Sequence, residues 1–221
     1  MNTDNQVRLI ITEDGSHSLY NDDLRETYHS TRGAIQESEH VFINAGLQTC
    51  QANPIRILEI GFGTGLNVLL TVIWSLKSNH PVIISSFEAF PLTAEVIESL
   101  NYGKLLDSEE WFRIIHQQGW NERVDYKNGI SIEKILANWQ ETQVEALYDV
   151  VFYDAFAPSK QPEMWGFELI KKACDALNPQ GVFVTYSATG QLKRDLVKAG
   201  MTVETLPGPP GKKEMVRAIK N

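Results

Sequence analysis

A carboxylate stands at the end of an apolar run in the second half of the chain. The run covers residues 150–153 and leads into Asp154, after which the sequence continues Ala-Phe-Ala-Pro-Ser-Lys-Gln-Pro-Glu-Met-Trp. If the run is a buried strand of an open α/β sheet, Asp154 lies at the carboxyl end of that strand, where such sheets bind their ligands. A carboxylate there can accept a hydrogen bond or a proton from a reacting group. We therefore predict that Asp154 is catalytic; the alternative is an acid that only caps a helix or braces the loop.

A glycine-rich turn follows another apolar segment. Residues 55–60 lead into Gly-Phe-Gly-Thr-Gly at 61–65, and a helical pattern begins at Leu66. Glycines allow a sharp turn and let a ligand approach the backbone closely. The spacing is GxGxG rather than GxGxxG, and no Gly-Lys-Ser or Gly-Lys-Thr follows. A dinucleotide pyrophosphate site and a nucleoside triphosphate site are therefore both disfavoured.

A second carboxylate, Glu88, ends the next apolar segment, residues 82–87. Its two oxygens can accept both ribose hydroxyls of an adenosine-containing cofactor. The order strand, GxGxG, helix, strand, acid predicts S-adenosylmethionine, which carries a sulfonium charge and no phosphate. The formal net charge of -8 at pH 7 agrees with a cationic ligand and argues against general polyanion binding.

Basic residues gather near the end of the chain. Residues 190–221 hold seven basic and three acidic residues, a net charge of +4. This region is either a local contact for a phosphate backbone or simply a solvated face.

These residues need a scaffold of alternating strands and helices. After a hairpin over residues 7–12 and 16–20, the pattern predicts one or two helices within residues 24–48. Strands are expected at 55–60, 82–87, 124–126, 149–153, 182–186, 202–206 and 215–220, and helices at 66–78, 93–100, 131–140, 162–177 and 190–199. Such alternation predicts a mostly parallel sheet covered on both faces, in one α/β domain over residues 51–221 with an extension over residues 1–50.

Other classes of protein find little support in the sequence. The histidines are scattered without ligand spacing, so we predict no metal site. Cys50 and Cys174 are expected to be free thiols, and Ser187 does not lie in a GxSxG motif. No apolar run is long enough to span a membrane and the first residues do not resemble a signal peptide, so we expect a cytoplasmic protein.

Four segments together resemble a known family. They are EIGFGTGLN at 59–67, FEAFPLT at 87–93, DAFAPSKQPEMW at 154–165 and GPPGKKEM at 208–215. They are similar to the methyltransferase half of MnmC, a bifunctional tRNA-modifying enzyme, over roughly residues 25–219. The resemblance implies a class I S-adenosylmethionine methyltransferase fold, Rossmann-like with a seven-stranded sheet. It also implies conversion of 5-aminomethyl-2-thiouridine to 5-methylaminomethyl-2-thiouridine at the tRNA wobble position.

The same resemblance implies roles for residues and partners. The cofactor-binding residues that we predict are Tyr28, Ser30, Glu59, Gly61, Gly63, Gly65, Asn67, Glu88 and Asn128. Tyr28 and Ser30 correspond to a segment that closes over the cofactor, although simple packing explains them equally well. Because the chain ends near residue 221, we expect a stand-alone transferase without the FAD-dependent oxidase half, and a separate oxidase or other amine-forming enzyme as its partner.

One position departs from the family pattern. The family carries Gly-Asp after the third strand, where the acid accepts a hydrogen bond from the adenine amino group. We align this position with Lys127-Asn128-Gly129. Asn128 could bind adenine through its amide, or it could only satisfy its own turn.

The expected substrate also suggests roles for aromatic and basic side chains. Phe156 or Trp165 could stack on the uracil ring, and Lys160, Lys212 and Lys213 could contact the flanking phosphates. Trp165 could instead be a core residue, and Lys160 could be an idle surface charge.

Two other functions remain open from the sequence. One is a small-amine methyltransferase or aminopropyltransferase of the same fold, because those enzymes also place an acid after the fourth strand. The other is an RNA-binding module without catalytic activity.

Overall fold

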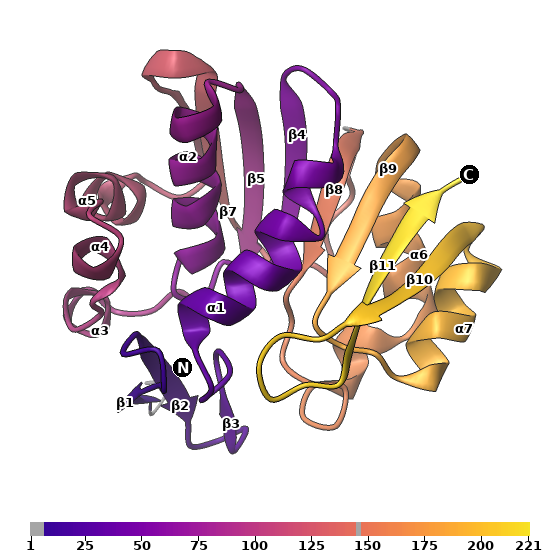
Figure 1. The fold of residues 1–221 in the computed structure, drawn as a ribbon, viewed down its shortest axis with the longest axis horizontal. Helices are drawn as coiled ribbons and strands as arrows, with labels where there is room; N and C mark the ends of the chain where they lie inside the picture. Colours follow the sequence, from indigo (N-terminus) through magenta and orange to yellow (C-terminus); the bar gives the residue numbers. More distant parts are fainter. Residues whose placement is uncertain (1–6, 145–146) are drawn as a thin grey trace.

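The computed structural model describes residues 7–144 and 147–221, and a single mixed sheet forms its centre (Figure 1). The strand order is β10-β11-β9-β8-β4-β5-β7-β6. The central strands β4 (Ile55–Ile60), β5 (Val82–Glu88), β7 (Ile130–Leu136), β8 (Tyr148–Tyr153) and β9 (Leu177–Thr185) pair in parallel. The edge strands β6 (Glu122–Asp125) and β10 (Met201–Pro207) pair antiparallel with their neighbours, and so does β11 (Glu214–Lys220), which lies between β10 and β9. The expected α/β class with a mostly parallel core is confirmed.

Among the described residues the sheet has eight strands, one more than the seven expected. The helix expected at 131–140 is wrong, because most of this segment is a strand. Residues 130–136 form β7, which pairs with β5 along its whole length. Ile130 and Ile132 are buried on one face of the strand, and alternating β-branched residues favour a strand over a helix. The segment expected as the third parallel strand, 124–126, lies instead at the edge as β6.

Helices cover both faces of the sheet. On one face, α1 (Ala34–Ser38), the π-helix η1 (Glu39–Asn44), α2 (Leu66–Ser78) and α5 (Glu109–Gln117) pack over alternate strand residues such as Ile57 and Val150. On the other face, α6 (Phe167–Asp175) and α7 (Gly190–Lys198) pack over Leu58 and Val151. Because strand side chains alternate between faces, neighbouring residues of β4 and β8 belong to two different cores.

Most of the other predicted elements are confirmed with altered bounds. The helix at 66–78 is confirmed, and the C-terminal hairpin is β10 with β11. The helix expected at 162–177 is divided into η4 (Pro162–Trp165) and α6. The remaining helices are short: η2 (Leu47–Thr49), α3 (Ala94–Glu98), α4 (Tyr102–Leu105) and η3 (Lys127–Gly129). Cys50 and Cys174 are free, as expected.

The N-terminal hairpin is confirmed and gains a third strand. β1 (Val7–Ile11), β2 (His17–Asn21) and β3 (Glu26–Thr27) form a small antiparallel sheet. It lies at the same end of the molecule as the carboxyl ends of the parallel strands (Figure 1). The residues after it, among them Val41 and Phe42, are buried in the core shared with β8 and β9. The division of the chain at residue 50 stays a prediction.

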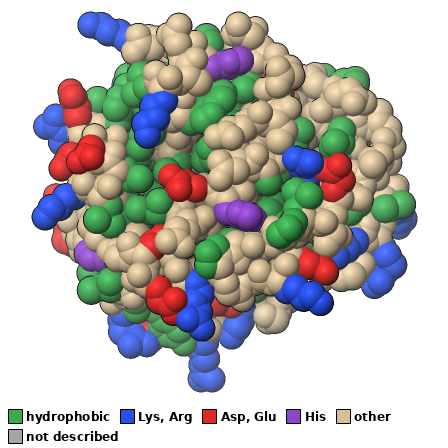
Figure 2. Space-filling model, in the orientation of Figure 1, with side chains coloured by type: hydrophobic (Ala, Val, Ile, Leu, Met, Phe, Trp, Pro, Cys, Tyr) green, Lys and Arg blue, Asp and Glu red, His purple; other side chains and the backbone are tan. Residues whose placement is uncertain are grey.

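The surface shows no single basic patch on the face drawn in Figure 2, where Lys and Arg side chains are dispersed among acidic ones. Within residues 7–144 and 147–221, no helix has the length and apolar character needed to cross a membrane. The same residues hold no group of His, Cys, Asp and Glu side chains arranged for a metal ion.

Candidate active site

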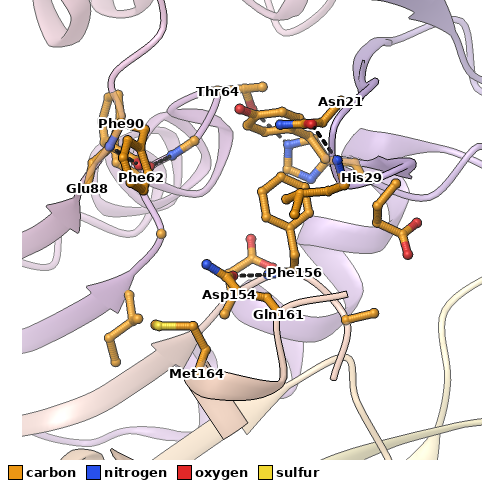
Figure 3. Close-up of a pocket in the computed structure, with 18 of the residues that line it drawn as sticks. Asn21, His29, Phe62, Thr64, Glu88, Phe90, Asp154, Phe156, Gln161 and Met164 are labelled. Carbon is orange, nitrogen blue, oxygen red and sulfur yellow. Dashed lines mark hydrogen bonds between the residues drawn. The ribbon is translucent and has the colours of Figure 1, made fainter. Parts of the chain in front are cut away.

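A cleft of ≈ 690 Å³ opens at the carboxyl ends of the parallel strands. Its walls come from the glycine turn after β4, the ends of β5, β7 and β8, and the segment from β2 to α1. Figure 3 shows Glu88 and Phe90 across the cleft from Asn21 and His29, with Asp154 toward the end of β8. The fold therefore brings the predicted cofactor acid and the predicted catalytic acid to one cavity.

The glycine turn is pressed against the end of β8. The N–H groups of Gly61 and Phe62 both donate to the carbonyl oxygen of Phe87 at 3.0 Å. Gly61 has a φ of 97°, and a Cβ atom there would lie 2.5 Å from the carbonyl oxygen of Asp154. Only glycine fits this conformation and this contact. This contact sets the short distance between the glycine turn and the backbone of Asp154.

Replacing Gly61 with alanine is expected to weaken cofactor binding at least about tenfold and to lower the free energy of unfolding by about 1–3 kcal/mol, because the new methyl group pushes the turn away from β8. Titration with S-adenosylhomocysteine and thermal unfolding measure the two effects. Gly166→Ala is the matched control, since its Cβ would meet nothing within 4 Å and its φ is -65°. Equal effects of the two substitutions would contradict the close contact.

Glu88 is the last residue of β5 and has both oxygens on the cleft rim. Its Oε2 accepts the N–H of Gly63 at 2.9 Å, and its Oε1 accepts the N–H of Phe90 at 2.9 Å. A carboxylate has about four lone-pair positions, so each oxygen keeps capacity for another donor. The two ribose hydroxyls of an adenosine group are suitable donors, and the residues present fit the cofactor at this point.

Asp154 lies directly after β8, where its backbone N–H donates to the carbonyl oxygen of Ile60 at 3.0 Å. Its Oδ2 accepts a hydrogen bond from Asn67 Nδ2 at 2.9 Å. Burial raises the pKa of Asp154 to about 7, and the charge of Glu37 acts in the same direction, whereas Asn67 and Lys212 lower it. A carboxyl group with a pKa near neutrality suits proton transfer at physiological pH.

Aromatic rings and one ion pair enclose the end of the cleft around Asp154. The rings of Tyr28 and Phe156 meet edge to face at 5.0 Å. Lys212 Nζ lies 2.6 Å from an oxygen of Glu37 and 3.7 Å from the centre of the Tyr186 ring. Because α1 and the loop before β11 supply Glu37 and Lys212, this pair joins distant parts of the chain over the cleft.

The cleft is strongly acidic among the described residues. Its lining holds six carboxylates and one ammonium group, namely Asp23, Glu26, Glu37, Glu88, Asp154, Glu163 and Lys212. Such a lining attracts cations and raises their local concentration. A sulfonium cofactor and an amine substrate both fit this charge, whereas a nucleoside triphosphate does not.

The predicted residues divide into two groups. Those that line the cleft are Tyr28, Ser30, Gly61, Gly63, Asn67, Glu88, Asp154, Phe156 and Lys212. Those outside the lining are Glu59, Gly65, Asn128, Lys160, Trp165 and Lys213. Glu59 is buried in β4, and Gly65 begins α2 with a φ of 71° beneath His116 and Phe62.

The structure does not place Asn128 at the cleft. Asn128 has a φ of 64° in the turn that precedes β7, at the opposite end of the parallel strands. Residues 137–140 follow the end of β7 and line the cleft, and Asn138 is the first of them with a polar side chain. The alignment that selected Asn128 depended on taking the edge strand β6 for the third parallel strand.

Trp165 is also not free to stack on a substrate base. Its side chain is buried, its Nε1 donates to the carbonyl oxygen of Phe156 at 2.7 Å, and its ring packs on Tyr153. It therefore supports the loop after β8 from behind. Lys160 and Lys213 lie outside the cleft lining, and their contact with phosphates stays a prediction.

Several lining residues escaped the sequence analysis, among them His29, Thr64, Phe90, Asn138 and Met164. His29 Nε2 and Thr64 Oγ1 are 2.7 Å apart, and burial lowers the pKa of His29 to about 4, so its ring is neutral. This bond ties the N-terminal segment to the glycine turn. Phe90 could have been identified as a lining residue from its position two residues after Glu88. No local sequence feature identifies His29, because its partner Thr64 is distant in sequence.

Comparisons with known proteins agree with the site. A family model described as S-adenosyl-L-methionine-dependent methyltransferase matches residues 108–221. A relative from Campylobacter hominis, named tRNA 5-methylaminomethyl-2-thiouridine biosynthesis bifunctional protein MnmC, is 27% identical over 211 residues, which cover 92% of this chain and 31% of the relative. A protein of the same name from Pseudoalteromonas atlantica is 31% identical over 218 residues, covering 88% of this chain and 31% of the relative. The chain thus spans about a third of the length of these relatives.

Solved structures extend the comparison to the fold. The structure of MNMC2 from Aquifex aeolicus superposes with a TM-score of 0.79 at 25% identity, over 98% of this chain and 71% of that chain. Spermidine synthase from Thermotoga maritima has a TM-score of 0.55 at 17% identity, over 96% of this chain and 72% of that chain, which shows a shared fold alone. The resemblance to the methyltransferase half of MnmC is confirmed, and the chain belongs to the family of S-adenosyl-L-methionine-dependent methyltransferases.

Proposed function

We propose that this chain methylates the primary amine of 5-aminomethyl-2-thiouridine at the tRNA wobble position and so forms 5-methylaminomethyl-2-thiouridine. The observation that carries the proposal is the shared cleft of Glu88 and Asp154, lined by the glycine turn. The names of the curated relatives, which specify 5-methylaminomethyl-2-thiouridine biosynthesis in tRNA, support the substrate. A tRNA substrate also favours a cytoplasmic location.

The bound cofactor supplies an activated methyl group on a sulfonium centre. Glu88 would hold its ribose hydroxyls, and Asn138 would offer an amide beside the end of β7 for the adenine. Gly61 and Gly63 leave room for it beside the backbone. These assignments leave Asp154 available for the other reactant.

Asp154 prepares the substrate amine. A primary alkylamine is mostly protonated at neutral pH and then has no lone pair for transfer. Asp154 would take one proton from the ammonium before transfer, and its hydrogen bond with a remaining N–H would direct the lone pair of the neutral amine. As the N–C bond forms, the S–CH₃ bond breaks, the sulfur leaves as a neutral thioether, and the positive charge passes to the methylated nitrogen. Holding the reacting atoms about 3 to 3.5 Å apart supplies much of the remaining rate enhancement.

The Tyr28–Phe156 pair and the Lys212–Glu37 pair shape the place for the substrate base. Phe156 lines the cleft two residues after Asp154, so its ring is the aromatic surface best placed for a uracil. Lys212 is engaged with Glu37 and Tyr186 inside the cleft. We therefore infer that Lys212 positions the cleft wall rather than contacting a tRNA phosphate.

The pH dependence of the reaction follows from Asp154. Because burial raises the pKa of this carboxyl to about 7, the proton-accepting form is lost as the pH falls below about 7. We expect kcat/KM, which reports the ionisation of the free enzyme, to fall about tenfold per pH unit in that range, as for a single ionisation. The residual activity of Asp154→Asn should lack this limb. An acid limb centred near pH 4, the ordinary range of an aspartate, would contradict the assignment.

A direct assay tests the proposed function. The purified protein is incubated with methyl-labelled S-adenosylmethionine and tRNA carrying the aminomethyl nucleoside, and the nucleosides are analysed by mass spectrometry. The expected result is one added methyl group on the wobble nucleoside. Parallel reactions contain spermidine, putrescine or fully methylated tRNA, and none should react. Reaction of the free polyamines alone would favour a small-amine transferase, and tRNA binding without transfer would favour a binding module.

We also propose that a separate enzyme, a FAD-dependent oxidase or another amine-forming activity, supplies the aminomethyl nucleoside. The curated relatives are bifunctional by name, and the matched region is about a third of their length. Their remaining length is thus available for a second activity. Adding the candidate oxidase to the assay above should allow precursor tRNA that lacks the free amine to be methylated.

A further inference from the structure

The loop after β8 folds back on itself beside the cleft. The N–H groups of Lys160 and Gln161 both donate to the carbonyl oxygen of Ala157, at 2.7 and 2.9 Å. The side chain of Gln161 returns toward the start of the loop, where its Oε1 accepts the backbone N–H of Phe156 at 3.3 Å. Since Phe156 is two residues from Asp154, their Cα atoms are at most about 7 Å apart. The loop therefore brings the Gln161 amide into the neighbourhood of the proposed catalytic acid.

The bond to Phe156 fixes the orientation of the Gln161 amide. A backbone N–H can only donate, so the amide atom that meets it must be the oxygen. The nitrogen Nε2 is then the free end and carries two N–H donors. Within the described ranges, 7–144 and 147–221, Nε2 donates to no other protein group. Gln161 lines the cleft, and Figure 3 shows it grouped with Asp154 and Phe156, apart from Glu88.

A 5-aminomethyl uracil presents an acceptor next to its amine. The carbonyl oxygen O4 is on the ring atom adjacent to C5, and C5 carries the aminomethyl group. A site that holds the amine at one side chain therefore has O4 close beside it. Cytosine has an amino group, a donor, at the same ring position. An N–H donor directed at this position accepts uracil and disfavours cytosine.

We propose that Gln161 selects uracil in the substrate. Its Nε2 donates to O4 of the base, while Asp154 holds the aminomethyl nitrogen and the ring of Phe156 contacts the face of the base. Three substrate contacts then come from one loop, residues 154–161. This inference rests on the proposed function, because it takes the same substrate, and it adds the residue that chooses the base.

The bonds around the loop keep the amide from adapting to cytosine. An amide that turned its oxygen toward a cytosine amino group would turn Nε2 toward the N–H of Phe156, donor against donor. The backbone cannot move aside easily, because Trp165 Nε1 donates to the carbonyl oxygen of Phe156 at 2.7 Å and Tyr186 Oη donates to that of Ala155 at 2.8 Å. A site rejects the wrong partner by such unmatched donors as well as by favouring the right one.

Gln161→Glu replaces the donor with an acceptor and keeps the loop bond. One carboxylate oxygen can still accept the N–H of Phe156, while the other faces the base and suits the amino group of cytosine. The substrates are two synthetic anticodon stem-loops with 5-aminomethyl-2-thiouridine or 5-aminomethyl-2-thiocytidine at the wobble position. Wild type should favour the uridine at least about tenfold in kcat/KM, and Q161E should favour the cytidine.

Gln140→Glu is the matched control. Gln140 lines the same cleft, and its side chain bonds Asn138 and Met164, which lie outside residues 154–161. Q140E adds the same charge and should keep the uridine preference of wild type. The ratio of the two substrates within one variant also cancels the effect of the added charge on Asp154, because both carry the same aminomethyl group. Gln161→Ala has neither donor nor acceptor, so its ratio should approach one.

A binding measurement separates this inference from the proposed function. Fluorescence anisotropy of the same stem-loops, with S-adenosylhomocysteine present, needs no methyl transfer. Wild type should bind the uridine stem-loop more tightly, and Q161E should bind the cytidine stem-loop more tightly. These binding preferences without any methyl transfer would reject the proposed function and leave the selection by Gln161 standing.

Three results would overturn the inference. Equal affinity and turnover of wild type for the two stem-loops would show that the cleft does not distinguish the bases. An unchanged uridine preference in Q161E, in binding and in transfer, would show that Gln161 only closes the loop. A loss of S-adenosylhomocysteine affinity of about tenfold or more in Q161E would show that Nε2 serves the carboxylate of the cofactor instead.

Discussion

Replacing Asp154 with alanine lowers methyl transfer by about 10²- to 10⁴-fold, while the affinity for S-adenosylmethionine changes by less than about threefold. The carboxylate is the group that takes the amine proton, and the cofactor contacts at Glu88 and the glycine turn remain in place. Single-turnover rates and titration with S-adenosylhomocysteine separate the two quantities.

Asp154→Asn is the isosteric control for this substitution. It keeps the volume of the side chain but removes the negative charge and the proton acceptor, so it should be nearly as inactive as alanine. Removing a buried acid whose pKa is raised also leaves the fold intact, so both variants should unfold no earlier than wild type near pH 8. An asparagine variant with more than about a tenth of wild-type turnover would show that Asp154 only shapes the loop.

Replacing Glu88 with alanine has the opposite effect. Hydrogen bonds to a charged group contribute about 1.5–3 kcal/mol, so losing the ribose contacts should weaken S-adenosylmethionine binding about 10- to 100-fold. The substitution also leaves the N–H groups of Gly63 and Phe90 without their partner, which loosens the rim of the cleft. At saturating cofactor, kcat should fall only a few-fold, because Glu88 does not act on the amine.

Glu163→Ala is the matched control, since Glu163 is an exposed acid of the same cleft lining. It changes the charge of the cleft by the same amount but removes no backbone bond from the glycine turn. Its cofactor affinity should stay within about twofold of wild type. Equal losses in the Glu88 and Glu163 variants would mean that the cofactor responds only to the overall charge of the cleft.

The parts of the site that sequence predicts are those set by local chain order. Gly61 and Glu88 each follow an apolar segment, and Asp154 follows a third. Once these segments are parallel strands of one sheet, their ends must meet at one edge. No long-range contact is needed for that argument, so the three residues could be found together before the fold was known.

The third parallel strand was not predictable by the same reasoning. Residues 130–136 carry the charged pair Glu133 and Lys134, which weakens the alternating pattern of a buried strand. Lys134 is nevertheless buried, with Nζ over the rings of Phe62 and Trp120 and donating to the carbonyl oxygen of His116. Only the tertiary structure supplies these partners. The error in the strand then carried over to Asn128 in place of Asn138.

The roles of the Lys212 and Trp165 side chains could not be predicted from the sequence either, because their partners are also set by the tertiary structure. Lys212 pairs with Glu37, far away in sequence, and Trp165 bonds the backbone of Phe156 from the core side. Residue type suggested a phosphate contact and a stacking surface, because both side chains commonly serve those purposes. Their actual partners depend on how the C-terminal loop and η4 fold back over the cleft.

Glu88 and Asp154 are proposed to serve the two reactants of one cleft. A crystal structure with S-adenosylhomocysteine would show whether they do. We expect the ribose hydroxyls on the Glu88 carboxylate, the glycine turn along the ligand, and the sulfur facing Asp154 with space between them for an amine. A ligand whose sulfur points away from Asp154, or whose ribose makes no contact with Glu88, would contradict it.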